Sequence, residues 1–131
     1  MPTPTDTVLR FFDVLRAQRS ADDLAALLDD ALVSEELPNR LLPQGHTRDK
    51  SAMLAGFERG RSYVGDQTYT ITQIVSEGDT VVVAFTWTGR VLVSAGPFQA
   101  GTALRAQCLG VFEVQRGRVV RHRTYDCYDP W

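Results

Sequence analysis

The sequence predicts an α+β fold, because helical spacing fills its first half and strand alternation fills its second. Near the start, apolar residues recur at the intervals of one helix face: Val8, Phe11, Phe12 and Leu15. After residue 68, apolar and polar residues alternate with period two, which is typical of half-buried strands. Three helices followed by a meander of long strands indicate a helical layer packed on one sheet.

Three helices are expected, and each has its own start signal. Residues 5–6 offer a cap for the first helix, which we expect to end near Arg19. Ser20 caps a short second helix with an apolar stripe of leucines. Residues 47–49 open the third helix, which is predicted to end near Gly60.

Five strands are expected, one between the second and third helices and four after the third. Pro38 stops the first strand, and Gly78 and Gly117 mark the tight turns of two hairpins. In chain order the predicted strands cover residues 29–37, 69–75, 80–91, 102–114 and 119–128.

The composition is that of a globular protein, with 131 residues, 44% hydrophobic, 23% charged and a net charge of −2. We expect one domain over residues 1–131, and neither nucleic acid nor a membrane as a partner. The start resembles no signal peptide, so a cytoplasmic location is predicted. Cys108 and Cys127 match no zinc or redox spacing, so two reduced, buried thiols are expected and no metal or cofactor.

The strand periodicity assigns inward-facing residues. On residues 80–91 the larger, wholly apolar face contains Phe85 and Trp87, so we expect it to point inward. On residues 102–114 the inward face contains Cys108 with other small side chains. Small residues beside large aromatic ones leave room either for a ligand or for a helix that packs there.

The last strand is chemically distinctive. His122, Thr124 and Asp126 alternate onto one face, whereas their neighbours point to the other. His122 and Asp126 are about 13 Å apart along a strand, too far to bond each other but near enough to line one pocket. These side chains either line a cavity or lie on the protein surface. His46 falls in a predicted loop and is expected to be solvated.

Two stretches resemble the nuclear transport factor 2-like superfamily. Residues 109–119 read L-G-V-F-E-V-Q-R-G-R-V and are followed by an R-x-Y-x-x-x-D tail; residues 36–49 read E-L-P-N-R-L-L-P-Q-G-H-T-R-D. Within the superfamily, the chain is most similar to SnoaL-like and limonene-epoxide-hydrolase-like domains. The resemblance implies a cone-shaped α+β barrel, with three helices packed in a curved mixed or antiparallel sheet around a central cavity. It also implies a homodimer, and the outer-face residues Leu109 and Val111 suit an interface.

The resemblance also bears on chemistry. The epoxide hydrolase family uses an Arg and an Asp on the third strand, where this chain has Phe85 and Trp87, and an Asp where it has Thr124. Epoxide hydrolysis is therefore not expected. The ketosteroid isomerase family places its base at the end of the first strand, where Glu36 stands nine residues before Gly45. Which of the adjacent Glu35 and Glu36 faces the cavity stays open.

Two functions remain. The first is a cofactor-independent isomerase or cyclase with Glu36 as base and His122 or Asp126 as acid or hydrogen-bond donor. The ligand-binding surface would then include Phe85, Trp87, Cys108 and Thr124. The second is a non-catalytic module that binds a small hydrophobic molecule or mediates dimerisation. The enzyme hypothesis requires at least two of the three polar residues to reach one pocket.

Overall fold

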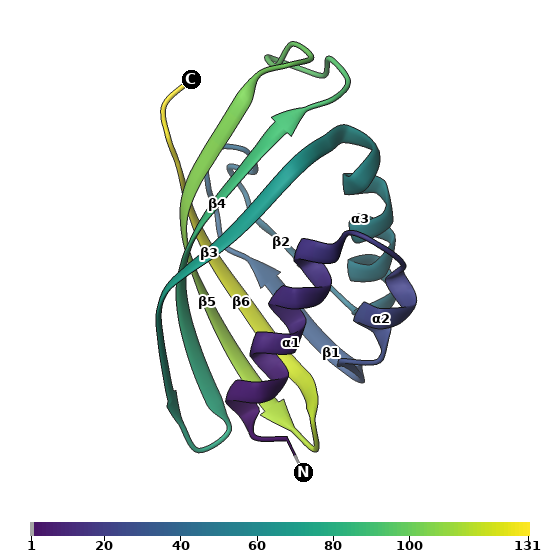
Figure 1. Cartoon of the computed structure of the whole chain (residues 1–131), viewed down its shortest axis with the longest axis vertical. Coiled ribbons are helices and arrows are strands. Elements are labelled where there is room, and N and C mark those ends of the chain that lie inside the picture. Colours follow the sequence, from purple (N-terminus) through teal and green to yellow (C-terminus); the bar gives the residue numbers. More distant parts are fainter. Residues whose placement is uncertain (1) are drawn as a thin grey trace.

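The computed structural model describes residues 2–131, which form three helices and six strands. This confirms the α+β class, with the helices packed on one curved sheet (Figure 1). In chain order the elements are α1 (Pro4–Ala17), α2 (Ala21–Ala25), β1 (Leu28–Glu36), β2 (His46–Arg48), α3 (Lys50–Tyr63), β3 (Val64–Glu77), β4 (Thr80–Val91), β5 (Ala103–Gln115) and β6 (Arg118–Tyr128).

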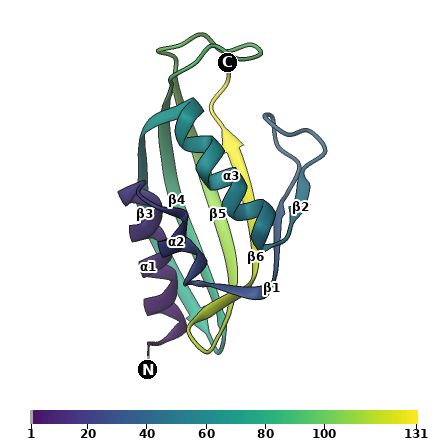
Figure 2. The ribbon, with the colours of Figure 1, turned by 90° about the vertical axis from the view of Figure 1, so that its right-hand side faces the viewer.

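The sheet is mixed and open, with strand order β2-β1-β6-β5-β4-β3. The pair β1–β6 is parallel and all other neighbours are antiparallel. The three helices lie on the same side of the curved sheet, with α1 across β3 to β6 and α3 nearer β1 and β2 (Figures 1 and 2). No helix of residues 2–131 covers the opposite face of the sheet (Figures 1 and 2).

The helices begin at polar caps, as helix starts require. The first helix begins earlier than predicted, because Thr3 rather than residues 5–6 is its cap. Thr3 and Asp6 form a capping box in which each side chain accepts a hydrogen bond from the other's backbone amide, both at 3.1 Å. Ser20 caps α2 as predicted, and the Asp49 carboxylate caps α3 by accepting from Ala52 N at 2.8 Å.

Two parts of the sheet differ from the sequence prediction. Strand β2 was expected to be the start of the third helix, but it pairs with the end of β1 before α3 begins. Strand β3 is longer at both ends than the predicted residues 69–75. These segments become strands through pairing with a neighbour, since their own alternation is weak or too short to indicate a strand.

The inward faces predicted for β4 and β5 are confirmed. Val81, Val83 and Phe112 are fully buried, and they pack with Phe11 and Phe12 of α1 in the core. The two phenylalanine rings of α1 meet Phe112 edge to face, at centroid distances of 5.2 and 6.0 Å. This aromatic cluster joins α1 to the sheet in the core.

The expectation that both thiols are buried was wrong. Cys108 and Cys127 are free thiols, as predicted, but Cys108 is half-buried, and Cys127 is exposed because it lies on the outer face. On the last strand, a register shift in the β5–β6 pair turns Val119 into the fully buried valine. Among residues 2–131, no helix combines the length and apolar character that a bilayer crossing demands.

Candidate active site

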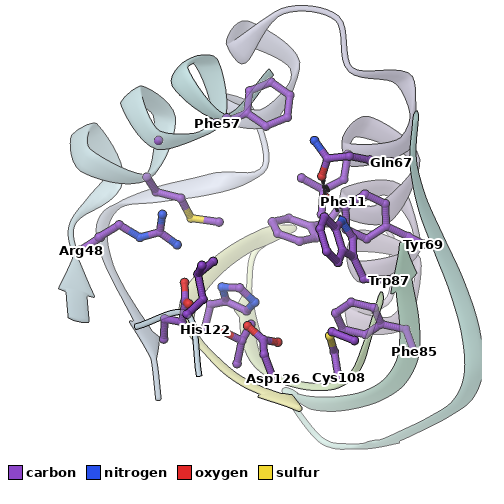
Figure 3. Close-up of a pocket in the computed structure, with 18 of the residues that line it drawn as sticks. Phe11, Arg48, Phe57, Gln67, Tyr69, Phe85, Trp87, Cys108, His122 and Asp126 are labelled. Carbon is purple, nitrogen blue, oxygen red and sulfur yellow. Dashed lines mark hydrogen bonds between the residues drawn. The ribbon is translucent and has the colours of Figure 1, made fainter. Parts of the chain in front are cut away.

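A cavity of about 520 Å³ lies between the concave face of the sheet, α1 and α3 (Figure 3). Its volume is in the range of pockets that hold small organic ligands. All seven side chains predicted from the sequence line it: Glu36, Phe85, Trp87, Cys108, His122, Thr124 and Asp126. The cavity thus brings together the three polar residues that the enzyme hypothesis requires.

Two carboxylates reach the cavity from adjacent strands. Glu36 is the last residue of β1, and its register partner on β6 is Thr124, two residues before Asp126. The Glu36 side chain is 16% exposed and accepts a hydrogen bond from Asn39 Nδ2 at 2.9 Å. Its neighbour Glu35 points elsewhere and is paired with Arg121 at 3.3 Å. Glu36 is therefore the glutamate of this pair that faces the cavity.

Asp126 is in an environment that favours its protonated form. Burial raises the pKa of the carboxyl, and the charge of Glu36 raises it further, whereas the Cys108 thiol opposes the shift. Cys108 is the register partner of Asp126 on β5, so the two side chains share one face. Burial, followed by the charge of Asp126, raises the pKa of the Cys108 thiol, so the thiol stays protonated and is not a nucleophile at neutral pH.

His122 forms part of the cavity floor and is 6% exposed. Its ring stacks on Phe112 at a centroid distance of 4.6 Å, and its Nδ1 is hydrogen-bonded to Ser34 Oγ at 3.3 Å. Burial lowers the pKa of the imidazole to about 3, and the charge of Arg48 acts in the same direction. His122 is therefore neutral at physiological pH, with one ring nitrogen engaged by Ser34.

An aromatic wall stands across the cavity from α3. Tyr69 Oη and Trp87 Nε1 both donate to Gln67 Oε1, each at 3.0 Å, which fixes the two rings beside Phe85 (Figure 3). Gly89 permits the Trp87 orientation, because a Cβ at this position would lie 2.7 Å from Trp87 Cζ2. Burial raises the pKa of the Tyr69 phenol to about 12, so this wall carries no charge.

Comparison with known proteins identifies the family. A family model described as "SnoaL-like domain" matches residues 8–122. The chain belongs to the SnoaL-like family. No curated protein sequence matches the chain.

Solved structures share the fold of this SnoaL-like domain at low sequence identity. IdmH from Streptomyces antibioticus, a candidate polyketide cyclase, is 23% identical with a TM-score of 0.79, over 94% of this chain and 91% of that one. An LEH-like epoxide hydrolase from M. tuberculosis is 24% identical with a TM-score of 0.73, over 96% and 82%. A SnoaL-like polyketide cyclase from Agrobacterium tumefaciens is 15% identical with a TM-score of 0.72, over 96% and 92%. At these identities the likeness shows the nuclear transport factor 2-like fold.

Sequence reasoning missed several polar residues of the SnoaL-like cavity, among them His46, Arg48, Gln67 and Tyr128. Tyr128 could have been predicted from the sequence, since it follows Asp126 by two residues and so shares its face of the strand. His46 and Arg48 gave no signal, because β2 is defined only by its pairing with β1. His46 is half-exposed at the cavity, with its Nε2 3.9 Å from Glu36 Oε1. Within residues 2–131, no three His, Cys, Asp or Glu side chains gather as metal ligands would.

Proposed function

We propose that this SnoaL-like domain binds a small ring compound in its cavity and catalyses proton transfer on it without a cofactor. The observation that carries the proposal is that Glu36 and Asp126 line one cavity together with the aromatic side chains of Tyr69, Phe85 and Trp87. A pair of carboxyl groups in different environments is suited to act as base and acid in the same reaction. The proposed class is an isomerase or cyclase that acts next to a carbonyl group.

In the proposed step, the Glu36 carboxylate takes a proton from the carbon beside the carbonyl. The electrons of that C–H bond move to the carbonyl oxygen, which receives the proton of Asp126, so an enol forms. In a conjugated enol, Glu36 then gives its proton to a different carbon while the enol oxygen returns its proton to Asp126, which completes an isomerisation. In an aldol cyclisation, the enol carbon attacks a second carbonyl of the same molecule, whose oxygen takes the proton from Glu36, and the enol oxygen returns its proton to Asp126.

The raised pKa of Asp126 supports its role as the acid in this step. His122 is assigned a hydrogen-bonding role rather than a charged one, because its buried ring stays neutral. The polyketide cyclases among the structural neighbours are named for reactions of this class. Epoxide hydrolysis is not proposed, since the apolar Phe85 and Trp87 stand on β4 and Thr124 on β6 where that chemistry needs Arg and Asp.

A test uses 2-tetralone, a bicyclic ketone with exchangeable protons beside its carbonyl. In D₂O, the protein is expected to accelerate deuterium incorporation at that carbon, measured by proton NMR. Glu36→Gln removes the base and Asp126→Asn removes the acid, so each should slow the protein-catalysed exchange by about a hundredfold or more. Asp129→Asn is the matched control, because Asp129 pairs with Arg105 and does not line the cavity.

The result that would overturn the catalytic proposal is exchange no faster than in buffer while calorimetry shows that 2-tetralone binds. That outcome would instead support the second candidate function, a non-catalytic ligand-binding module. One observation favours this alternative: Tyr69 Oη and Trp87 Nε1 both donate to Gln67, so neither is free to stabilise a developing negative charge.

A further inference from the structure

The Arg48 side chain enters the cavity without a protein acceptor. It leaves the end of β2, and Figure 3 shows its guanidinium directed into the cavity, opposite Trp87 and Phe85. Its Nε is buried and has no hydrogen-bond partner among residues 2–131. A guanidinium has five N–H donors and is charged at neutral pH, so a buried unpaired donor on this group is costly. Such a group indicates a place for an acceptor that the protein does not supply.

Glu36 is the natural candidate for an internal partner, but it is engaged elsewhere. It accepts a hydrogen bond from Asn39 and lies 3.9 Å from His46. Its charge influences Arg48 from a distance, yet no ion pair joins Arg48 to any carboxylate of the described chain. The contrast with Arg61 is informative, because Arg61 also has a buried unpaired Nε but donates through its other nitrogens to Gln18 O and Glu58.

Helix α3 makes room for the guanidinium through Gly56. A Cβ added at Gly56 would lie 3.0 Å from Arg48 Nη1, so the planar group rests against the bare backbone of the helix. Glycine in the interior of a helix costs about 1 kcal/mol relative to alanine. The close approach of Arg48 explains why a glycine occupies this position in the helix.

The surroundings on this side of the cavity favour an anion next to an apolar body. Arg59 of α3 also lines the cavity. Burial lowers the pKa of the Arg48 guanidinium, and the positive charge of Arg59 acts in the same direction. Two neighbouring cations repel each other and are relieved by a negative group between them. Met53 and Phe57 provide apolar contact on the same helix.

We infer that Arg48 binds a carboxylate, or another anionic oxygen, of a mostly apolar ring ligand. This assignment rests on the proposed ring-binding function and adds a ligand class to it. The anionic end lies against Arg48 and Gly56, and the rings extend toward Phe85 and Trp87. Arg48 is thus a specificity-determining residue, which selects acidic ring compounds over neutral ones of the same shape.

The test compares two probes of similar shape, 2-naphthoate and its neutral methyl ketone analogue 2-acetylnaphthalene, by isothermal titration calorimetry. The wild-type protein is expected to bind 2-naphthoate at least about tenfold more tightly, as a charge-assisted hydrogen bond in a buried site would produce. Arg48→Met should remove this preference and leave the affinity for 2-acetylnaphthalene unchanged. Arg48→Lys should retain part of it, because lysine keeps the charge but lacks the planar fork.

Two further variants separate binding from stability and from net charge. Gly56→Ala is expected to weaken 2-naphthoate binding severalfold without loss of thermal stability, because the new methyl group displaces the guanidinium while alanine favours the helix. Arg10→Met removes one positive charge from an exposed position outside the cavity and should change neither affinity.

Equal affinities of the wild-type protein for the two probes, or a preference that survives in a folded Arg48→Met, would overturn the assignment of anion binding to Arg48. The proposed ring-binding function would not be affected by either result. Failure of both probes to bind would instead count against the ring-binding function on which it rests, and so against both proposals. If Arg48→Met does not fold by circular dichroism, an unchanged preference in Gly56→Ala and in Arg48→Lys together would equally refute the inference.

Discussion

At the scale of single residues, burial acts on the cavity's acids and bases in opposite directions. It raises the pKa of the Asp126 carboxyl and lowers that of the His122 imidazole, because in both cases the neutral form is preferred away from water. The guanidinium of Arg48 cannot be neutralised in this way at physiological pH. Arg48 therefore stays charged inside the cavity, and its Nε is buried without a hydrogen-bond partner among residues 2–131.

His122 makes a prediction about stability and pH. Its pKa is about 3 in the folded state against an ordinary value near 6.5, so between these values the unfolded chain binds the extra proton. Folding stability should thus fall as the pH falls below about 6.5, by about 1.4 kcal/mol per pH unit from this group. We expect urea unfolding to show that the wild-type protein loses about 2 kcal/mol more than His122→Asn between about pH 7 and pH 5.

Other titrating groups do not account for this difference in pH dependence between the wild-type protein and His122→Asn. The raised pKa of Asp126 has the opposite sign, since it costs stability as the pH rises through its window. Asp126 faces Cys108, Tyr128 and, at a greater distance, Glu36, whereas His122 faces Arg48; these groups are common to both proteins. Parallel pH profiles for wild type and His122→Asn would show that the imidazole takes up its proton at the same pH in the folded and unfolded states, which would contradict its lowered pKa.

At the scale of elements, α3 closes the cavity that the sheet leaves open. Its inner side contributes Met53, Gly56 and Phe57 to the lining, yet Met53 is its one buried residue. Few buried contacts hold the helix, so its N-terminal cap gains importance relative to packing. The cap residue Asp49 also follows directly after Arg48, so the cap fixes the chain where the guanidinium departs.

Asp49→Ala should therefore loosen the site as well as the helix. Loss of an N-cap carboxylate typically costs about 1 kcal/mol, which corresponds to a fall in Tm of roughly 3–5 °C for a domain of this size. Thermal unfolding by circular dichroism measures it. Ser51→Ala, an exposed change in the first turn of the same helix, is the control and should shift Tm by less than half as much. An equal Tm for wild type and Asp49→Ala would show that the cap does not stabilise α3.

At the scale of the whole molecule, the parts that the sequence predicts well are those with strong local patterns. The alternation of β4 and β5 correctly placed Phe85, Trp87 and Cys108 on the inner face, and the tail pattern did so for His122 and Asp126. Features that depend on pairing between distant segments could not be predicted from local sequence patterns. Strand β2 exists because β1 pairs with it, and the register shift beside Glu113 turns Val119 inward.

The same dependence explains why the ligand-selecting end of the cavity was missed. From the sequence, Arg48 is one charged residue at the predicted start of a helix, and only the pairing of β2 with β1 ahead of α3 places it at the cavity. By contrast, Tyr128 lies in the predicted strand 119–128 and continues the period of Asp126, so the spacing alone could have assigned it to the cavity. Residues on long strands are thus predictable from spacing, whereas residues brought in by short connecting segments require the fold.

The outer face of the sheet leads to a proposal about assembly: we propose that two copies associate through it. No helix of the described chain covers this face (Figures 1 and 2). Leu109 and Tyr125 are register partners there and are 37% and 42% exposed. Exposed apolar side chains that touch across strands form a patch better suited to a protein partner than to water. Arg121 and Glu113, which are also paired across β5 and β6, place both signs of charge beside this patch, as an isologous interface allows.

Size-exclusion chromatography with light scattering should therefore give a mass of twice the 14.6 kDa of one chain at micromolar concentration. Leu109→Glu puts a charge in the middle of the patch and is expected to yield a folded monomer, because an unpaired buried charge is costly. Leu9→Glu is the matched control, since Leu9 is 39% exposed but lies on α1, on the other side of the sheet. A wild-type monomer, or a dimer that Leu109→Glu leaves intact, would contradict the proposal. The cavity lies on the helix-covered side of the sheet and this patch on the other side, so the monomeric variant should keep the affinity of the wild type for 2-acetylnaphthalene.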